Sequence, residues 1–221
     1  MAGTVHDLAK SLGEWFEGSR VELTVKALEK NGFKAAFVPD ANAAVKAISD
    51  MIPDGVTVGV GGSMTMHQIG FFDAMKARNI ELVNPFAEGV SPEQRGELLR
   101  KTLTCDCYVA GTNAVTEEGH LFNIDGTGNR VAAMIFGPKK TILVCGVNKI
   151  VSDMEEARKR VWDKAAPMNA KRLDKKTPCA KTGLCADCSS PDRICNACVE
   201  LVKKPTMSDI HVVIVGEHLG L

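Results

Sequence analysis

The chain has 221 residues, 45% of them hydrophobic and 24% charged, which is the composition of a globular protein with a sizeable core. Lys and Arg number 27, and Asp and Glu also number 27, so a formal net charge of zero excludes a general electrostatic attraction to nucleic acid or a membrane surface. No apolar run reaches the ~18 residues of a membrane span, and residues 1–20 lack the basic start and apolar core of a signal peptide. We therefore expect a cytoplasmic protein with no membrane span and no nucleic-acid partner.

Helices and strands alternate through the first half of the chain. Apolar spacing and capping residues predict helices over 20–31, 40–51, 64–78 and 91–104. Short β-rich runs predict strands over 33–38, 56–60, 80–83 and 107–111. Alternation of this kind is typical of an open α/β sheet whose strands are mainly parallel and flanked by helices.

The pattern changes after residue 111. Apolar runs separated by glycines predict strands over 114–116, 121–124, 132–136 and 141–145, which add a small additional β-sheet or hairpins. Ser152, with Glu155 three residues later, resembles a capping box that opens a helix to residue 162. A last strand over 210–216 returns to the main sheet, so we expect one α/β domain over 1–221 with a Cys-rich loop insertion at 166–205.

The first candidate for a ligand site is the glycine loop that follows the strand over 56–60. Glycines at a strand's carboxyl end let the backbone approach an anion, and the following helix offers free N–H groups. Hydroxyl side chains would add donors, and His67 and Gln68 could face the same cleft. The expected ligand-binding residues are Gly61, Gly62, Ser63 and Thr65. The plainer alternative is a tight strand-to-helix turn with Ser63 as the N-cap.

The second candidate is a dense group of polar residues between residues 113 and 130. Asn and Asp beside Gly are typical of turns, so two hairpin turns would explain part of it. The group nevertheless has more hydrogen-bonding capacity than turns require, and we expect ligand contacts from Asn113, Asn123 and Asn129. Arg130 could clamp a carboxylate or phosphate, Asp125 could orient the ligand, and Glu117 could act as a base or nucleophile.

The third candidate is a cysteine segment between Pro178 and Val199. Five of the eight cysteines lie there among turn-forming residues, at Cys179, Cys185, Cys188, Cys195 and Cys198. In a reducing compartment thiols are more often metal ligands or buried groups than disulfides. Two CxxC pairs could hold one tetrahedral zinc ion, and the same thiols could hold an iron–sulfur cluster. Free thiols or redox-active CxxC pairs are the alternative.

Four stretches together resemble the LUD-domain family, whose members are named for lactate utilisation, and the chain is similar to its stand-alone members. They are the glycine loop with its strand at 58–65, TNAVTEEGHLFNIDGTGNR at 112–130, VAAMIFGPKKTILVCGVNKI at 131–150 and PCAKTGLCADCSSPDRIC at 178–195. The resemblance covers residues 20–216. It implies the fold of the ribose-5-phosphate isomerase, CoA-transferase and 5-formyltetrahydrofolate cyclo-ligase group.

The resemblance also implies a function in the oxidation of L-lactate to pyruvate, alongside iron–sulfur oxidoreductase subunits. The expected protein is an accessory subunit of organic-acid metabolism that binds a small anionic metabolite and carries a Cys-ligated metal centre. The chain departs from the family pattern at two positions. Cys198 is an extra thiol, so the expected metal ligands are narrowed to the other four cysteines of the segment. Gln68 stands where the family has an acidic residue, so a carboxylate role is not expected there. This interpretation also allows a homo-oligomer, in which the partner is a second copy of the chain.

Two rival functions remain open at the level of sequence. One is a ligase or transferase that acts on a folate, a CoA thioester or a sugar phosphate, with Glu117 as its base or nucleophile. The other is a non-enzymatic electron-transfer or interaction module that uses the cysteine segment. Because a fold does not determine a function, the sequence ranks these alternatives without deciding between them.

Overall fold

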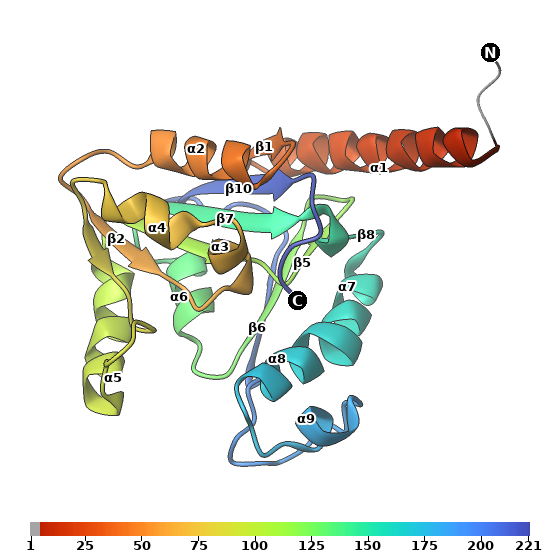
Figure 1. The fold of residues 1–221 in the computed structure, drawn as a ribbon. Coiled ribbons are helices and arrows are strands. Elements are labelled where there is room, and N and C mark those ends of the chain that lie inside the picture. The colour runs from red at the N-terminus through yellow and green to blue at the C-terminus, as the bar shows by residue number, and fades with distance from the viewer. Residues whose placement is uncertain (1–4) are drawn as a thin grey trace.

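A six-stranded parallel sheet forms the centre of the computed structural model, which describes residues 5–221 (Figure 1). Its strand order is β1-β10-β7-β4-β2-β3, and all five pairings are parallel. The strands are β1 (Lys34–Val38), β2 (Thr57–Val60), β3 (Glu81–Val83), β4 (Cys107–Gly111), β7 (Lys140–Gly146) and β10 (Asp209–Val215). The predicted fold class, an open mainly parallel sheet, is therefore confirmed.

Helices cover both faces of this sheet because its strands are apolar on both sides. On β7, Leu143 and Cys145 face a core shared with α1 (Val5–Lys30) and α6 (Asn129–Ile135). Ile142 and Val144 face the opposite core. That core is covered by α2 (Ala41–Met51), α3 (Met64–Gln68) and α4 (Phe71–Lys76), while α5 (Pro92–Lys101) precedes β4.

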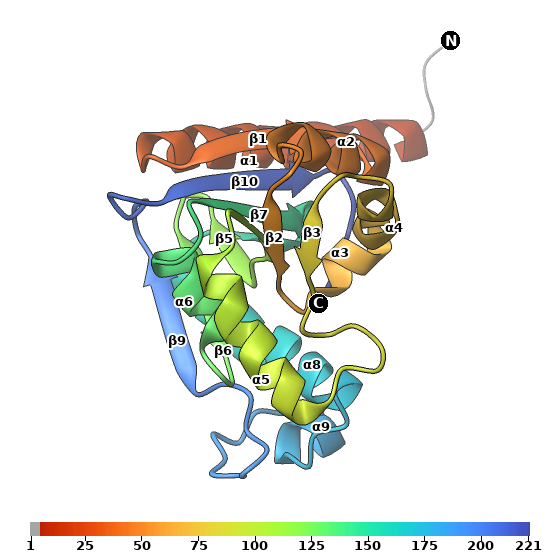
Figure 2. The ribbon, with the colours of Figure 1, turned by 90° about the vertical axis from the view of Figure 1, so that its left-hand side faces the viewer.

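A second sheet contacts α1 at one end and extends from there toward the opposite end of the molecule (Figures 1 and 2). Its strand order is β8-β5-β6-β9, formed by β5 (Ala114–Thr116), β6 (Leu121–Asp125), β8 (Ile150–Val151) and β9 (Ala197–Leu201). A third core joins it to α7 (Met154–Arg160), the π-helical turn Val161–Ala165 and α8 (Ala166–Arg172). The small additional sheet is thus present, and β9, from within the expected insertion, is one of its strands.

The predicted strand over 132–136 is wrong, because those residues belong largely to α6. Asp125 at the end of β6 accepts hydrogen bonds from the main-chain N–H groups of Arg130 and Val131, at 2.9 and 3.1 Å. These bonds satisfy donors that a helix N-terminus otherwise leaves free. Gly128, at φ 87°, makes the turn that brings them to the carboxylate. A cap five residues away in sequence overrides the β propensity of the apolar run.

Other boundaries differ for similar local reasons. The first helix begins at Val5, and its N-terminal half extends beyond the sheet with exposed apolar side chains at Val5, Leu8, Leu12, Trp15 and Phe16 (Figure 1). The helix expected over 64–78 is split into α3 and α4 at Gly70, which has φ 77°. Asp153, and not Ser152, caps α7, because its carboxylate accepts from the Glu156 N–H. No helix within residues 5–221 is long and apolar enough to cross a membrane.

Candidate functional site

The glycine loop and the polar group meet at the carboxyl ends of two neighbouring strands. β2 and β4 pair in parallel, and the Gly61 N–H donates to the Val109 carbonyl at 3.0 Å. The hydroxyl of Ser63 lies against Gly111, where a Cβ would come within 2.8 Å of it. Ser63 makes no capping hydrogen bond to α3. The two regions singled out from the sequence are therefore in contact, at the edge where open α/β sheets bind ligands.

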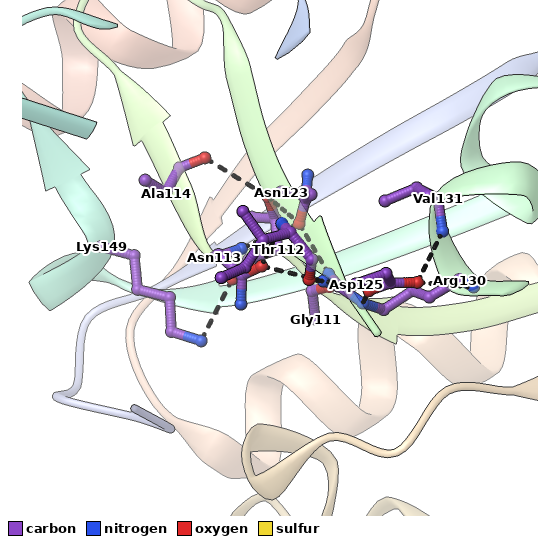
Figure 3. Close-up of polar contacts among 10 residues, drawn as sticks. Gly111, Thr112, Asn113, Ala114, Asn123, Asp125, Arg130, Val131 and Lys149 are labelled. Carbon is purple, nitrogen blue, oxygen red and sulfur yellow. Dashed lines mark hydrogen bonds and ion pairs between the residues drawn. The ribbon is translucent and has the colours of Figure 1, made fainter. Parts of the chain in front are cut away.

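Arg130 is the centre of the polar group (Figure 3). Its Nε donates to Asp125 Oδ1 at 2.9 Å, and its two terminal nitrogens donate to the side-chain oxygens of Asn123 and Asn113, at 2.6 and 2.8 Å. The same nitrogens also reach the carbonyls of Gly111 and Ile124, at 3.0 and 2.8 Å. These bonds use all five N–H groups of a guanidinium. Arg130 ties β4, β6 and α6 together, and its expected role as an anion clamp stays a prediction that this geometry does not favour.

The two asparagines fix the loop between β4 and β5. Asn123 Oδ1 accepts from the Thr112 hydroxyl at 3.2 Å and from the Asn113 N–H at 3.0 Å, in addition to Arg130. Asn113 Oδ1 accepts from the Ile124 N–H at 3.0 Å. Asn123 is fully buried, yet its Nδ2 has no hydrogen-bond partner within the described chain. Both side chains are therefore held rigidly, with one buried donor left over.

A second unpaired donor lies beneath the glycine loop. Tyr108 on β4 is fully buried, and its hydroxyl has no partner in the described residues. A Cβ at Gly61 would come within 2.9 Å of that hydroxyl, so the loop packs directly over it. Burial raises the pKa of Tyr108, which keeps the phenol protonated as a donor.

Lys149, like Tyr108 and Arg160, is a site residue that the sequence analysis missed. It ends a single 3-10 turn after β7 and is 5% exposed. Its ammonium donates to the Thr112 carbonyl at 3.2 Å (Figure 3). It also donates weakly to the Thr65 hydroxyl at 3.5 Å. Within residues 5–221 it forms no ion pair with a carboxylate. Burial, reinforced by the positive charges of Arg160 and Arg130, lowers its pKa to about 8. Its place directly after a buried strand was the signal in the sequence that could have identified it.

Arg160 on α7 adds another cation that has no acidic side chain as a partner in the described chain. Its guanidinium donates to the carbonyls of Asn148 and Asn113, at 3.2 and 2.7 Å, and to a main-chain oxygen of Leu221, the last residue of the sequence, at 2.9 Å. Burial lowers its pKa from the usual value. Three of its five N–H groups are used in this way. Among side chains, the edge of the sheet thus holds Lys149, Arg160 and Arg130 against one carboxylate, that of Asp125, which Arg130 already occupies.

The remaining predicted residues are placed in different ways. Thr65 is buried beside Lys149, and Asn129 is the first residue of α6. Glu117 lies at the other end of the β5–β6 hairpin and pairs with Arg20 of α1, so it does not join the group around Arg130. His67 is exposed and stacks on Phe72, while Gln68 accepts from the Gly220 N–H at 2.6 Å.

The cysteine segment is far from these residues in the sequence. It leads into β9, which pairs with β6, the strand that carries Asn123 and Asp125. Four of its thiols line one cavity of about 20 Å³, namely Cys179, Cys185, Cys188 and Cys195. Cys198 lies on β9, opposite Ile124 of β6, and is exposed. All eight cysteines are free thiols, and Cys105, Cys107 and Cys145 are buried, as expected. In residues 5–221 no three His, Cys, Asp or Glu side chains are placed to hold a metal ion without rearrangement.

Together these features define an α/β protein with three cationic side chains, one of them buried, at the carboxyl edge of a parallel sheet and a separate thiol-lined cavity. The chain belongs to the LUD-domain family, whose model matches residues 21–215. The family is associated with lactate utilisation in general. No curated protein matches the chain at a significant level.

Of three similar solved structures, one supports the same fold. A DUF162 family protein from Deinococcus radiodurans aligns with a TM-score of 0.52 at 13% identity, covering 90% of this chain and 98% of the other. Ribose 5-phosphate isomerase A from Neisseria gonorrhoeae aligns with a TM-score of 0.34 at 20% identity, over 57% of this chain and 63% of the isomerase. The isomerase from Plasmodium falciparum gives 0.35 at 17% identity, over 51% and 52%. Only the first of these likenesses extends over the whole fold.

Proposed function

We propose that the protein is an accessory protein of L-lactate oxidation to pyruvate that binds a small carboxylate metabolite at the carboxyl edge of the six-stranded sheet. The observation that carries the proposal is the buried ammonium of Lys149, which has two polar contacts and no acidic partner in the described chain. Family membership supports the link to lactate utilisation, and the cationic side chains of the site support an anionic ligand.

The electrostatics of the site favour an anion. Burying an ammonium ion costs several kcal/mol unless a counter-charge or a full set of acceptors compensates. Lys149 has three N–H donors and two acceptors, and the nearby guanidinium of Arg160 adds a like charge. A ligand carboxylate at this position would pair with Lys149 and lower the electrostatic cost of the whole group.

The surrounding hydroxyl groups suit a carboxylate that bears an oxygen on its second carbon. Ser63, which is partly buried against Gly111, and Thr65, which is next to Lys149, both supply hydroxyl groups. Hydroxyl groups can donate to the carbonyl of a 2-oxo acid or accept from the hydroxyl of a 2-hydroxy acid. L-lactate and pyruvate therefore fit the same arrangement. As an accessory protein, the chain would exchange this ligand with an iron–sulfur oxidoreductase subunit.

Calorimetric titration of the purified protein with L-lactate and with pyruvate tests the proposal. We expect binding that weakens at least tenfold in Lys149→Met, because the anion loses its cationic partner. Lys164→Met removes an exposed lysine and is the matched control, which should bind as the wild type does. Absence of binding of both acids to the wild-type protein, or equal affinity in Lys149→Met, would overturn the proposal.

The rival enzyme function has less support. A ligase or transferase acting on a folate, a CoA thioester or a sugar phosphate needs a nucleophile or base at the ligand. Glu117, the residue expected to fill that role, pairs with Arg20 beside α1. Turnover of acyl-CoA, or of formyltetrahydrofolate with a nucleotide, by the wild-type protein would favour this rival over an accessory role.

A further inference from the structure

We propose that Cys179, Cys185, Cys188 and Cys195 bind a thiolate-ligated metal centre, and that Cys198 is not one of its ligands. This site is separate from the anion site and does not depend on the proposed function. The first observation is that these four thiols, and not the fifth, line a single cavity. They come from helix α9 (Pro178–Thr182), from the loop after it and from the residues just before β9.

The second observation concerns what holds this segment together. No residue between 178 and 200 is fully buried, and residues 183–196 contain neither helix nor strand. Of its two four-carbon aliphatic side chains, Leu184 is 73% exposed and Ile194 is only partly buried. Apolar burial is the main source of folding free energy in most segments, and it is nearly absent here. A metal cross-link supplies that free energy directly in small Cys-rich folds, since ligand binding and folding are coupled.

The lining of the cavity suits thiolate ligands. Apart from the sulfurs it is largely apolar, with Trp162, Ala166, Pro167 and Ile194 on its walls. Each ligating thiol releases its proton as it binds, and the bound cation then balances the thiolate charge within this apolar lining.

Arg193 supplies both positive charge and rigidity beside the four sulfurs. Its guanidinium donates to the main-chain carbonyls of Cys188 and Cys195, at 2.6 and 3.3 Å, and pairs with Asp187 at 2.8 Å. It therefore fixes the chain on both sides of the loop that joins two of the ligands. Four thiolates with a divalent ion carry a net negative charge, which the adjacent guanidinium partly offsets.

A zinc ion and an iron–sulfur cluster share this thiolate chemistry. A cavity of about 20 Å³ accommodates a single ion. In a tetrahedral zinc site, with Zn–S of about 2.3 Å, the sulfurs must approach each other to within ~4 Å. Because no such convergence exists in the described residues, binding requires side-chain rotation or movement of the loop at Cys185, whose side chain is exposed. Movement of the same loop away from the cavity would instead make room for a cluster.

The test uses full-length protein purified without oxygen and without added metal. Zinc, iron and acid-labile sulfide are measured, together with the visible spectrum. Zinc in a colourless protein identifies a single-ion site, and iron with sulfide in a brown protein identifies a cluster. Either result supports the proposal. Overturning it would take a protein that contains neither metal and takes up neither when given zinc, or iron with sulfide under reducing conditions.

Single substitutions then identify the ligands. Cys179→Ser, Cys185→Ser, Cys188→Ser and Cys195→Ser should each lose most of the bound metal, whereas Cys198→Ser should retain it. Native-state alkylation followed by mass spectrometry provides a readout in the wild-type chain, without any substitution. With metal bound, Cys198 should be the thiol of this segment that reacts readily, and chelation should expose the other four. Equal metal loss in Cys198→Ser, or an unchanged alkylation pattern after chelation, would contradict the assignment.

Discussion

Arg130 and Asp125 form a closed pair at the junction of the two sheets. The carboxylate accepts from the Arg130 side chain and from the Arg130 main-chain N–H, both at 2.9 Å. Only 14% and 9% of the two side chains are exposed. A single residue therefore caps helix α6 with its backbone and neutralises the same carboxylate with its guanidinium. The pair provides the frame on which Asn113 and Asn123 are held.

Arg130→Met should destabilise the fold strongly, because it leaves Asp125 buried without a counter-charge. Removing one partner of a buried ion pair costs roughly 3–5 kcal/mol. Arg158→Met is the matched control. Arg158 pairs with Glu200 at 3.0 Å, but 51% of its side chain is exposed, so the change should cost less than ~1 kcal/mol. The free energy of unfolding in urea measures both, and similar losses in the two variants would show that the Asp125 pair is not special.

Much of this frame could be predicted from the sequence, and its limits have identifiable causes. Alternating helical and β-rich apolar runs, separated by turn residues, were enough to predict the parallel sheet, because the apolar pattern of each run indicates which of its residues are buried. The strand order was not accessible, because it depends on which runs pair. Helix α6 was missed because its cap, Asp125, belongs to a different element. Lys149 was missed because a lysine gains significance only when the fold buries it.

The cysteine segment shows the opposite balance. Its spacing pointed to a metal site before any fold was known, and the four thiols do share one cavity. The sequence analysis did not identify β9, which completes the second sheet by pairing with β6, because this strand is only five residues long and directly follows a turn-rich segment. The sequence thus indicated thiols that lie near one another, but not the elements that support them, and the metal itself stays a prediction.

Gly119→Ala should be far more damaging than Gly55→Ala, although both glycines have φ of 78°. A Cβ at Gly119 would lie 2.4 Å from the main-chain carbon of Ala27, whereas nothing lies within 4 Å of a Cβ at Gly55. Left-handed backbone costs alanine about 1 kcal/mol at either position. The backbone clash at Gly119 adds to this by forcing the β5–β6 hairpin away from α1. Thermal unfolding of the two variants separates the backbone strain, which both share, from the clash with α1, which only Gly119→Ala has. Equal shifts in Tm would show that α1 moves away from the new Cβ without loss of stability.

The pH dependence of stability should report the buried ammonium of Lys149. Its pKa falls from 10.5 to about 8 on folding, so between these values the unfolded chain binds more protons and stability rises with pH. The gain is up to ~3 kcal/mol over this window. Cys145 has the opposite effect. Burial raises its pKa from 9.0 to about 11, so between these values the folded chain binds more protons and the stability that Cys145 contributes falls as pH rises.

The difference between the wild type and Lys149→Met isolates the lysine, since both proteins contain Cys145. We expect Lys149→Met to be more stable than the wild type below pH 8 and the advantage to disappear as pH rises toward 10.5. Urea denaturation across this range measures the difference. A constant difference at every pH would mean that Lys149 keeps its charge in both states, and that the methionine acts through packing alone.

Metal removal should loosen β9 and leave the six-stranded sheet intact. β9 pairs with β6 on one side, and the Asn196 N–H donates to the Asp125 carbonyl at 2.9 Å directly after the last proposed ligand. If the metal centre anchors the chain before β9, chelation frees that end of the strand. Amide hydrogen exchange should then accelerate over 183–201, while β10, which is paired on both sides within the main sheet, exchanges as before. The Cys198→Ser protein should respond to the chelator in the same way, because its four ligands are unchanged. Acceleration in β10 as well would mean that the chelator unfolds the whole domain, and unchanged exchange over 183–201 would mean that the loop is held without metal.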